Sequence, residues 1–102
     1  AKPASRALVP PRGLAALCRR HHIRRLGVFG SAARGELRAH SDVDLLVEFA
    51  ADAAPGLFEM VRIRDDFARL FGRPVDLLTA TTLENPYRRS AVMKDLRVLY
   101  AA

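Results

Sequence analysis

Two aspartates, Asp42 and Asp44, stand one residue apart at the head of the apolar segment 43–49, which reads VDLLVEF. Side chains alternate along a strand, so both carboxylates are expected on one face. Asp76 occupies the same place in a second V-D-L-L pattern, on another apolar segment. If the two segments are neighbouring strands, three carboxylates converge, and each pair repels by roughly 3 kcal/mol at ~5 Å in an effective dielectric of about 20. The spacing therefore predicts a site that a cation must hold together.

Magnesium is the cation that this donor set favours. Carboxylate oxygens are ligands that Mg²⁺ prefers, and paired Mg²⁺ ions roughly 3.5–4 Å apart promote in-line displacement at phosphorus. We therefore expect Asp42, Asp44 and Asp76 to bind magnesium, with two ions as the expected number. For Asp42 alone a turn role is the simpler interpretation, because Ser41 and Asp42 also suit a turn. Asp44 and Asp76 each stand between large apolar residues, where an unpaired carboxylate is costly.

Gly30 and Ser31 precede these aspartates and can hold an anion. Glycine lets a phosphate approach the backbone closely, and Ser31 offers a hydroxyl and an N–H at the start of a short helix. A P-loop is excluded because Gly35 is followed by Glu36 rather than by lysine. The sequence thus predicts a phosphate site that adjoins the carboxylates.

Hydrophobic periodicity divides the chain into helices and strands in the order α-β-α-β-α-β-α, followed by a short apolar segment that can form a last strand. We expect helices over 11–22, 32–37, 56–71 and 87–95, and strands over 25–29, 43–49, 74–79 and 96–100. This order predicts an α/β or α+β fold in which helices cover one sheet. On the longest helix, the core face is expected to carry Leu57, Met60, Phe67 and Phe71.

The length of 102 residues fits one domain with one core. We assign residues 1–10 to a flexible tail and residues 11–102 to the domain. Cys18 is the only cysteine, so no internal disulfide can form, which suits a reducing, cytoplasmic setting. No apolar run approaches ~18 residues, so no membrane span is expected.

Basic residues outnumber acidic ones, 17 to 11, and give a formal net charge of +6. That balance favours anionic partners such as nucleotides, RNA or an acidic protein face. The run from Arg19 to Arg25 is most simply a solvated basic face, and docking of an acidic protein surface or of RNA is the alternative. Direct nucleic-acid binding is not expected, but this run leaves it open.

Three segments together resemble a known superfamily: FGSAARGE at 29–36, SDVDLLV at 41–47 and VDLL at 75–78. They resemble the DNA polymerase beta-like nucleotidyltransferases, and most of all the minimal nucleotidyltransferases (MNT), the antitoxin half of HEPN–MNT toxin–antitoxin pairs. The similarity extends over roughly residues 23–100. It implies a nucleotidyltransferase fold, in which helices pack against a small mixed sheet.

The resemblance also implies a role for each matching residue. Gly30–Ser31 corresponds to the pair that contacts the nucleotide phosphates, and Arg34 corresponds to a residue that can approach a phosphate. Asp42 and Asp44 correspond to two metal ligands. Asp76 corresponds to the third carboxylate, which helps to activate the attacking hydroxyl.

The reaction implied by the resemblance is Mg²⁺-dependent transfer of AMP from ATP to a tyrosine hydroxyl of a partner HEPN ribonuclease toxin, with release of pyrophosphate. We expect no second domain to form the acceptor site, so a HEPN partner or a second copy of the chain is expected to complete it. Two alternatives remain. One is an antitoxin that neutralises the toxin by binding only. The other is nucleotidyl transfer to a small molecule or an RNA end, and the missing second domain argues against it.

Overall fold

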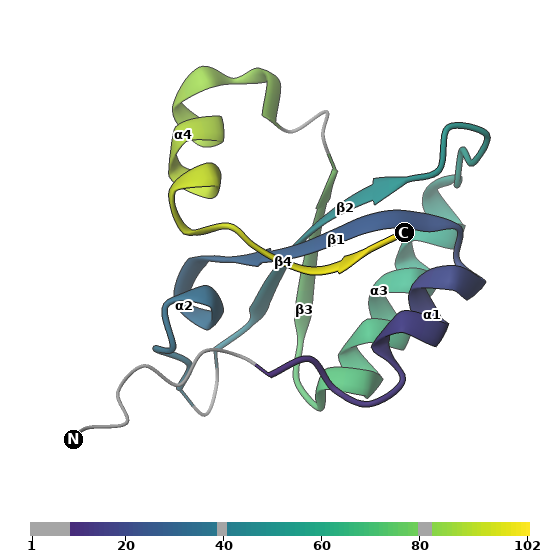
Figure 1. Ribbon diagram of the computed structural model, residues 1–102, viewed down its shortest axis with the longest axis horizontal. Helices are drawn as coiled ribbons and strands as arrows, with labels where there is room; N and C mark the ends of the chain where they lie inside the picture. Colours follow the sequence, from purple (N-terminus) through teal and green to yellow (C-terminus); the bar gives the residue numbers. More distant parts are fainter. Residues whose placement is uncertain (1–8, 39–40, 80–82) are drawn as a thin grey trace.

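The computed structural model describes residues 9–38, 41–79 and 83–102 (Figure 1). The strands are β1 (Ile23–Phe29), β2 (Val43–Phe49), β3 (Val75–Thr79) and β4 (Arg97–Ala101), and the helices are α1 (Leu14–Arg20), α2 (Gly30–Ala33), α3 (Leu57–Phe71) and α4 (Pro86–Asp95). The sheet order is β3-β2-β1-β4, in which β2 and β3 are parallel and the other neighbours antiparallel. Every predicted element is present, and the small mixed sheet with helices packed against it confirms the predicted fold class.

Two helices differ from their predicted bounds by two residues or more at each end, and most of the predicted tail, residues 1–10, lies outside the described residues. α1 begins after Gly13, at φ 94°, and ends before His22, at φ 58°. Both residues are left-handed, a conformation that a right-handed helix cannot contain. α2 begins directly at Gly30, two residues before the predicted start, and ends before Gly35, at φ 74°.

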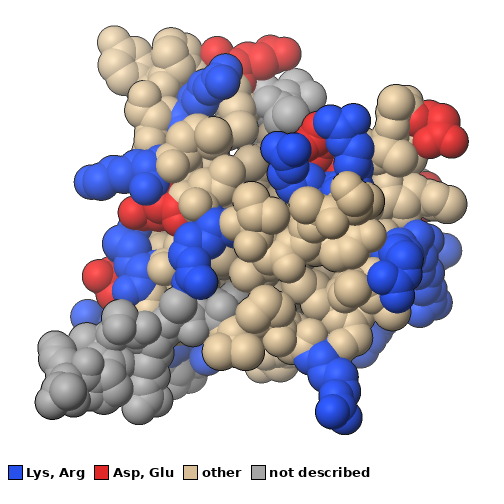
Figure 2. All heavy atoms as spheres, viewed as in Figure 1, with Lys and Arg blue, Asp and Glu red and all other residues tan. Residues whose placement is uncertain are grey.

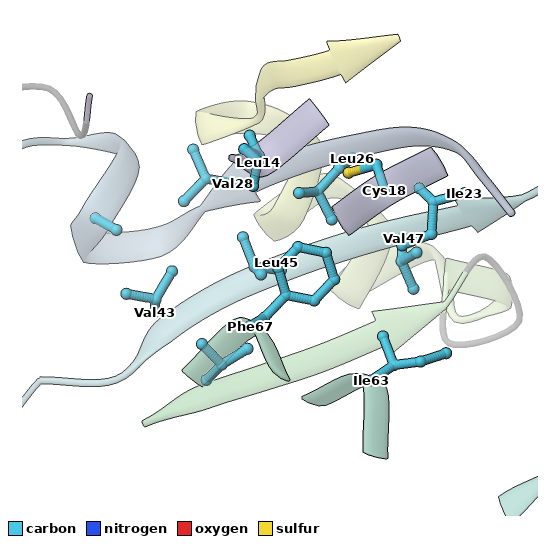
Figure 3. Packing of buried hydrophobic residues seen from close by; sticks show 12 residues of the cluster. Leu14, Cys18, Ile23, Leu26, Val28, Val43, Leu45, Val47, Ile63 and Phe67 are labelled. Carbon is cyan, nitrogen blue, oxygen red and sulfur yellow. The ribbon is translucent and has the colours of Figure 1, made fainter. Parts of the chain in front are cut away.

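One face of the sheet carries the core (Figure 3). Val43, Leu45 and Val47 alternate along β2 and are almost fully buried, in one cluster with Cys18 of α1 and Phe67 of α3. Figure 1 shows α1 and α3 side by side on this face. The alternate residues of β2 therefore project from the opposite face, which we call the outer face. α4 lies over the outer face and contacts β1 and α2.

The core under α3 differs from the prediction at its first turn. Leu57 was expected to face the core, and this is wrong, because it is 77% exposed. The buried positions of the helix are Ile63 and Phe67, while Met60 and Phe71 are half-buried. The predicted core face of α3 therefore packs against the sheet only from Met60 onward, and the first turn of the helix extends past the core.

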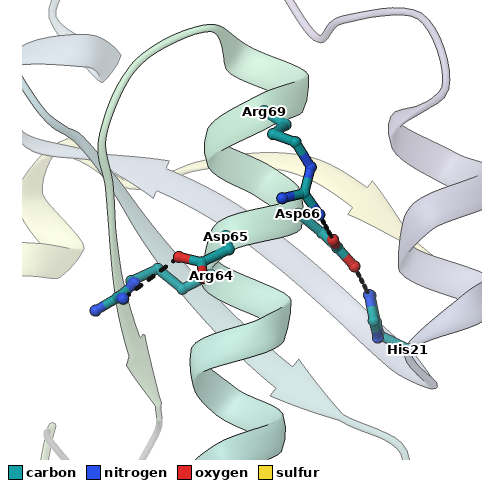
Figure 4. A network of polar contacts seen from close by, with 5 residues as sticks. All are labelled: His21, Arg64, Asp65, Asp66 and Arg69. Carbon is teal, nitrogen blue, oxygen red and sulfur yellow. Dashed lines mark hydrogen bonds and ion pairs between the residues drawn. The ribbon is translucent and has the colours of Figure 1, made fainter.

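A polar contact joins His21, the residue that ends α1, to α3 (Figure 4). Nε2 of His21 lies 2.9 Å from Oδ2 of Asp66, and Arg69 pairs with the same carboxylate. The hydrogen bond from His21 is the main reason why the pKa of Asp66 is lowered, with a smaller contribution from Arg69. This contact fixes the end of α1 against the middle of α3.

Basic side chains form several separate groups on the face shown in Figure 2, with acidic side chains between some of them. Within the basic run, Arg24 places Nη2 2.9 Å from Oε2 of Glu48, and Arg25 places Nε 3.8 Å from Oε1 of the same residue. Part of the positive charge of this basic run is therefore balanced by Glu48 of the same chain. In the described part of the protein, no helix is both long enough and apolar enough to cross a membrane.

Phe67→Ala should lower the free energy of unfolding by roughly 3–5 kcal/mol, because it removes a fully buried ring from the core. Phe58→Ala on the same helix is the matched control, since Phe58 is 86% exposed. It should change that free energy by less than about 0.5 kcal/mol. Urea denaturation followed by circular dichroism measures both variants, and similar losses for the two would contradict this packing of α3.

Candidate active site

Asp44 lies in the central position of a row of three paired residues, one from each of three neighbouring strands. In β2 it is the Cα partner of Asp76 in the parallel strand β3 and of Phe29 in the antiparallel strand β1. Residues paired across neighbouring strands project from the same face, so Asp44 and Asp76 both project from the outer face. Asp42 lies just before β2 and is exposed. The register thus places the second and third predicted aspartates side by side.

Three carboxylates interact at this position. The pKa of Asp44 is raised above its usual range, first by burial and then by the negative charges of Asp76 and Asp42. Arg88 acts in the opposite direction and lowers the same pKa, by less than the other causes raise it. Asp44 therefore has a surplus of negative charge around it.

Gly30 packs directly against this carboxylate. Its φ of 71° is left-handed, and a Cβ at this position would lie 2.6 Å from Oδ2 of Asp44. Any side chain here would have to displace Asp44, so both the backbone conformation and the space require glycine. Gly30 opens α2, and the next residue, Ser31, is half-buried. The predicted phosphate pair and the predicted metal ligands therefore adjoin one another.

Arg34 has carboxylate partners of its own. Its Nε lies 2.9 Å from Oε1 of Glu36, and its Nη1 lies 2.6 Å from Oδ2 of Asp95, at the end of α4. The hydrogen bond to Glu36, followed by that to Asp95, raises the pKa of Arg34. In this arrangement Arg34 ties the segment after α2 to α4, and its contact with a phosphate stays a prediction.

Arg88 is a residue of this region that the sequence did not single out. It lies in the first turn of α4, and its N–H donates to the side-chain oxygen of the capping residue Asn85, at 3.3 Å. At helical spacing it shares a face with Val92, which is buried, and with Asp95. Arg88 forms no ion pair with another described residue. Its position depends on how α4 docks, which no local pattern encodes.

The donor set suits Mg²⁺, which takes oxygen ligands. Among the described residues, no three His, Cys, Asp or Glu side chains are already close enough to hold one metal ion. Repulsion between like charges keeps carboxylates apart, and the exposed side chains of Asp42 and Asp76 have room to rotate toward Asp44. Because the negative charges of Asp76 and Asp42 act on Asp44 more strongly than the positive charge of Arg88, these residues fit a divalent cation. Its binding stays a prediction.

Comparison with known proteins identifies the family. The sequence profile described as "Nucleotidyltransferase domain" matches residues 12–99. The chain belongs to the nucleotidyltransferase family. This confirms the resemblance found in the sequence, and it makes transfer of a nucleotidyl group the activity of the domain.

Curated relatives of this nucleotidyltransferase include two archaeal proteins. It is 38% identical over 66 residues to the protein adenylyltransferase MntA of Thermococcus cleftensis, and that match covers 65% of each protein. It is 32% identical over 77 residues to MJ1379 of Methanocaldococcus jannaschii, which is provisionally named a protein adenylyltransferase. That match covers 76% of this chain and 77% of MJ1379.

Solved structures of the same fold include a protein provisionally named a minimal nucleotidyltransferase, with a TM-score of 0.66 at 38% identity, covering 80% of this chain and 81% of that one. A toxin–antitoxin complex with AMP-PNP gives a TM-score of 0.69 at 18% identity, covering 85% and 69% of the two chains. A tri-AMPylated Shewanella oneidensis HEPN toxin in complex with MNT antitoxin gives 0.61 at 16% identity, covering 85% and 66%. Those two complexes establish likeness of fold alone.

Gly30→Ala tests the packing of α2 on Asp44. Alanine in the left-handed region costs roughly 1–2 kcal/mol by itself, and here its Cβ also meets the carboxylate. Gly72→Ala is the matched control, because Gly72 has a φ of 74° with no atom within 4 Å of an added Cβ. Urea denaturation should give a larger loss of stability for Gly30→Ala than for Gly72→Ala, whereas equal losses would contradict the contact.

Asp44→Asn should leave the metal-free protein at least as stable as the wild type at pH 7. The folded-state pKa of Asp44 lies above its usual value, so the ionised carboxyl opposes folding above both pKa values, and this opposition disappears as the pH falls below both. The difference in stability between the variant and the wild type should therefore shrink as the pH falls. Thermal unfolding between pH 7 and pH 3 in a chelator measures it, and a variant less stable than wild type at pH 7 would contradict the raised pKa.

Proposed function

We propose that this nucleotidyltransferase is an Mg²⁺-dependent antitoxin that transfers AMP from ATP to a tyrosine hydroxyl of a partner HEPN ribonuclease toxin. The observation that carries the proposal is the register that aligns Asp44 with Asp76 while Gly30 packs on Asp44. It supports a phosphate site and an acidic site side by side. The names of the curated relatives support protein adenylylation, and the complex of MNT antitoxin with an AMPylated HEPN toxin supports the class of partner.

ATP binds through its phosphates at the start of α2. The backbone at Gly30 admits a phosphate closely, and Ser31 donates its hydroxyl. Arg88, which forms no ion pair with another described residue, supplies a positive charge that acts on Asp44. Asp42 and Asp44, with Asp76 as the third ligand, would hold Mg²⁺, which would supply positive charge to neutralise the phosphates and polarise the α-phosphate.

Asp76 is suited to meet the acceptor. It is exposed on β3, which is an edge strand of the sheet, so another chain can approach it. Asp76 accepts the proton of the tyrosine hydroxyl, whose oxygen forms the new bond to the α-phosphorus. The bond from that phosphorus to the oxygen bridging to the β-phosphate breaks, and pyrophosphate leaves. The chain contributes positioning and charge neutralisation rather than a covalent intermediate.

A cytoplasmic setting belongs to the same proposal. Cys18 is buried in the core, and burial raises the pKa of its thiol to about 11. The thiol therefore stays protonated and unreactive at neutral pH.

Asp44→Asn and Asp76→Asn should each reduce AMP transfer to a co-expressed HEPN toxin by at least about 10²-fold, because each removes charge needed where the phosphates react. Asp52→Asn is the control, since Asp52 is exposed in the turn after β2. Intact-mass spectrometry of the toxin measures the added AMP. Unchanged labelling by Asp44→Asn would show that the site is assigned wrongly.

An antitoxin that acts by binding only predicts a different outcome of the same experiment. In that case the wild-type protein blocks toxicity while no tyrosine of the toxin gains the mass of AMP. Transfer to a small molecule or an RNA end predicts that labelled ATP marks those acceptors and not the toxin.

A further inference from the structure

A partly open cavity of about 360 Å³ lies between α4 and the outer face of the sheet. Its floor includes Gly27 of β1 and Leu46 of β2, and its roof includes Met93 and Leu96 at the end of α4. Cavities of this size with mostly apolar walls are typical of small-molecule sites. No residue of the predicted phosphate or metal site lines it, so the functions assigned above leave it unexplained.

The cavity lies next to the proposed reacting centre. Leu46 follows Asp44 by two residues along β2, so it projects from the same face roughly 7 Å further on. Gly27, the Cα partner of Leu46, lies three residues before Gly30 on the adjoining strand. If the α-phosphate of a nucleotide lies at Asp44, the base, which is attached through one sugar ring, therefore reaches the floor of the cavity.

Two charged groups of the cavity wall have no partner among the described residues. Glu48 pairs with Arg24, but neither Glu84 nor Arg89 forms an ion pair or side-chain hydrogen bond there. Glu84 offers acceptors and Arg89 offers donors. Adenine presents the complementary pair, an N6 amino donor beside ring-nitrogen acceptors, whereas guanine presents the O6 acceptor where adenine has the donor.

We propose that this cavity receives the adenosine of the nucleotide, with Glu84 and Arg89 contacting the edge of the base and Leu46 and Met93 its faces. The inference rests on the proposed function, because it takes the phosphates to lie at Gly30 and Ser31. It assigns the choice of nucleotide, which the phosphate and metal sites do not make, to α4 together with Glu84, which precedes the helix.

Met93→Trp is the test, since Met93 is 49% exposed and the larger ring can fill the cavity without disturbing the core. Calorimetry with the whole chain in Mg²⁺ compares ATP with inorganic tripolyphosphate. ATP affinity should fall at least about tenfold, while that for tripolyphosphate stays within about twofold of wild type. Leu57→Trp is the control, because Leu57 is an exposed residue of α3 that does not line the cavity. It should alter the affinity for neither ligand. An equal loss of affinity for ATP and tripolyphosphate, or no loss of affinity for either, would overturn the proposal.

Glu84→Gln adds a readout of base choice, because it should narrow the preference for ATP over GTP. An unchanged preference would contradict the contact with the base. If Met93→Trp instead raises only the KM for the toxin, the cavity receives the acceptor and the proposal is wrong. Binding is measured without an acceptor, so a wild-type protein that binds ATP in this manner but transfers no AMP would overturn the proposed function and leave the adenosine site standing.

Discussion

Repulsion between carboxylates on neighbouring strands is the constraint on which the rest of this structure depends. The parallel pairing of β2 with β3 aligns Asp44 with Asp76 on the outer face, and Asp42 adds a third negative charge close by. Such an arrangement opposes folding unless the other face of the sheet stabilises the strands strongly. That face does so, because the alternate residues of β2 are buried against α1 and α3. The core thus keeps the strands in register while the site remains short of positive charge.

The arginines around the site divide into two kinds. Arg34 is committed to Glu36 and Asp95, so it positions α4 relative to the start of α2. Arg88 and Arg89 have no carboxylate partner among the described residues, and both belong to α4. α4 therefore combines a fixed end with an end whose charges are available to a ligand. This division gives one helix the tasks of completing a cavity and of balancing the charge beside Asp44.

Much of the fold follows from local patterns in the sequence. The segment 43–49 was predicted with its observed bounds, because its apolar run begins directly after Ser41 and Asp42 and ends at the loop that starts with Ala50. The proximity of Gly30 to Asp44 was expected from chemistry, yet the left-handed φ and the lack of room for a Cβ beside Oδ2 of Asp44 come only from tertiary structure. Leu57 was misplaced because helical periodicity gives the direction of a side chain and not the length of sheet beneath it. Arg88 and the cavity could not be predicted, since both arise from the docking of α4 onto the sheet.

We propose that these carboxylates share a divalent cation beside the phosphate site. Crystals of the protein grown with Mn²⁺ and a non-hydrolysable ATP analogue test it most directly, because Mn²⁺ is located by its anomalous scattering. We expect an ion in contact with Asp42 and Asp44, with the phosphates of the analogue against Gly30 and Ser31. An ion bound away from all three aspartates, or phosphates held elsewhere on the chain, would contradict it.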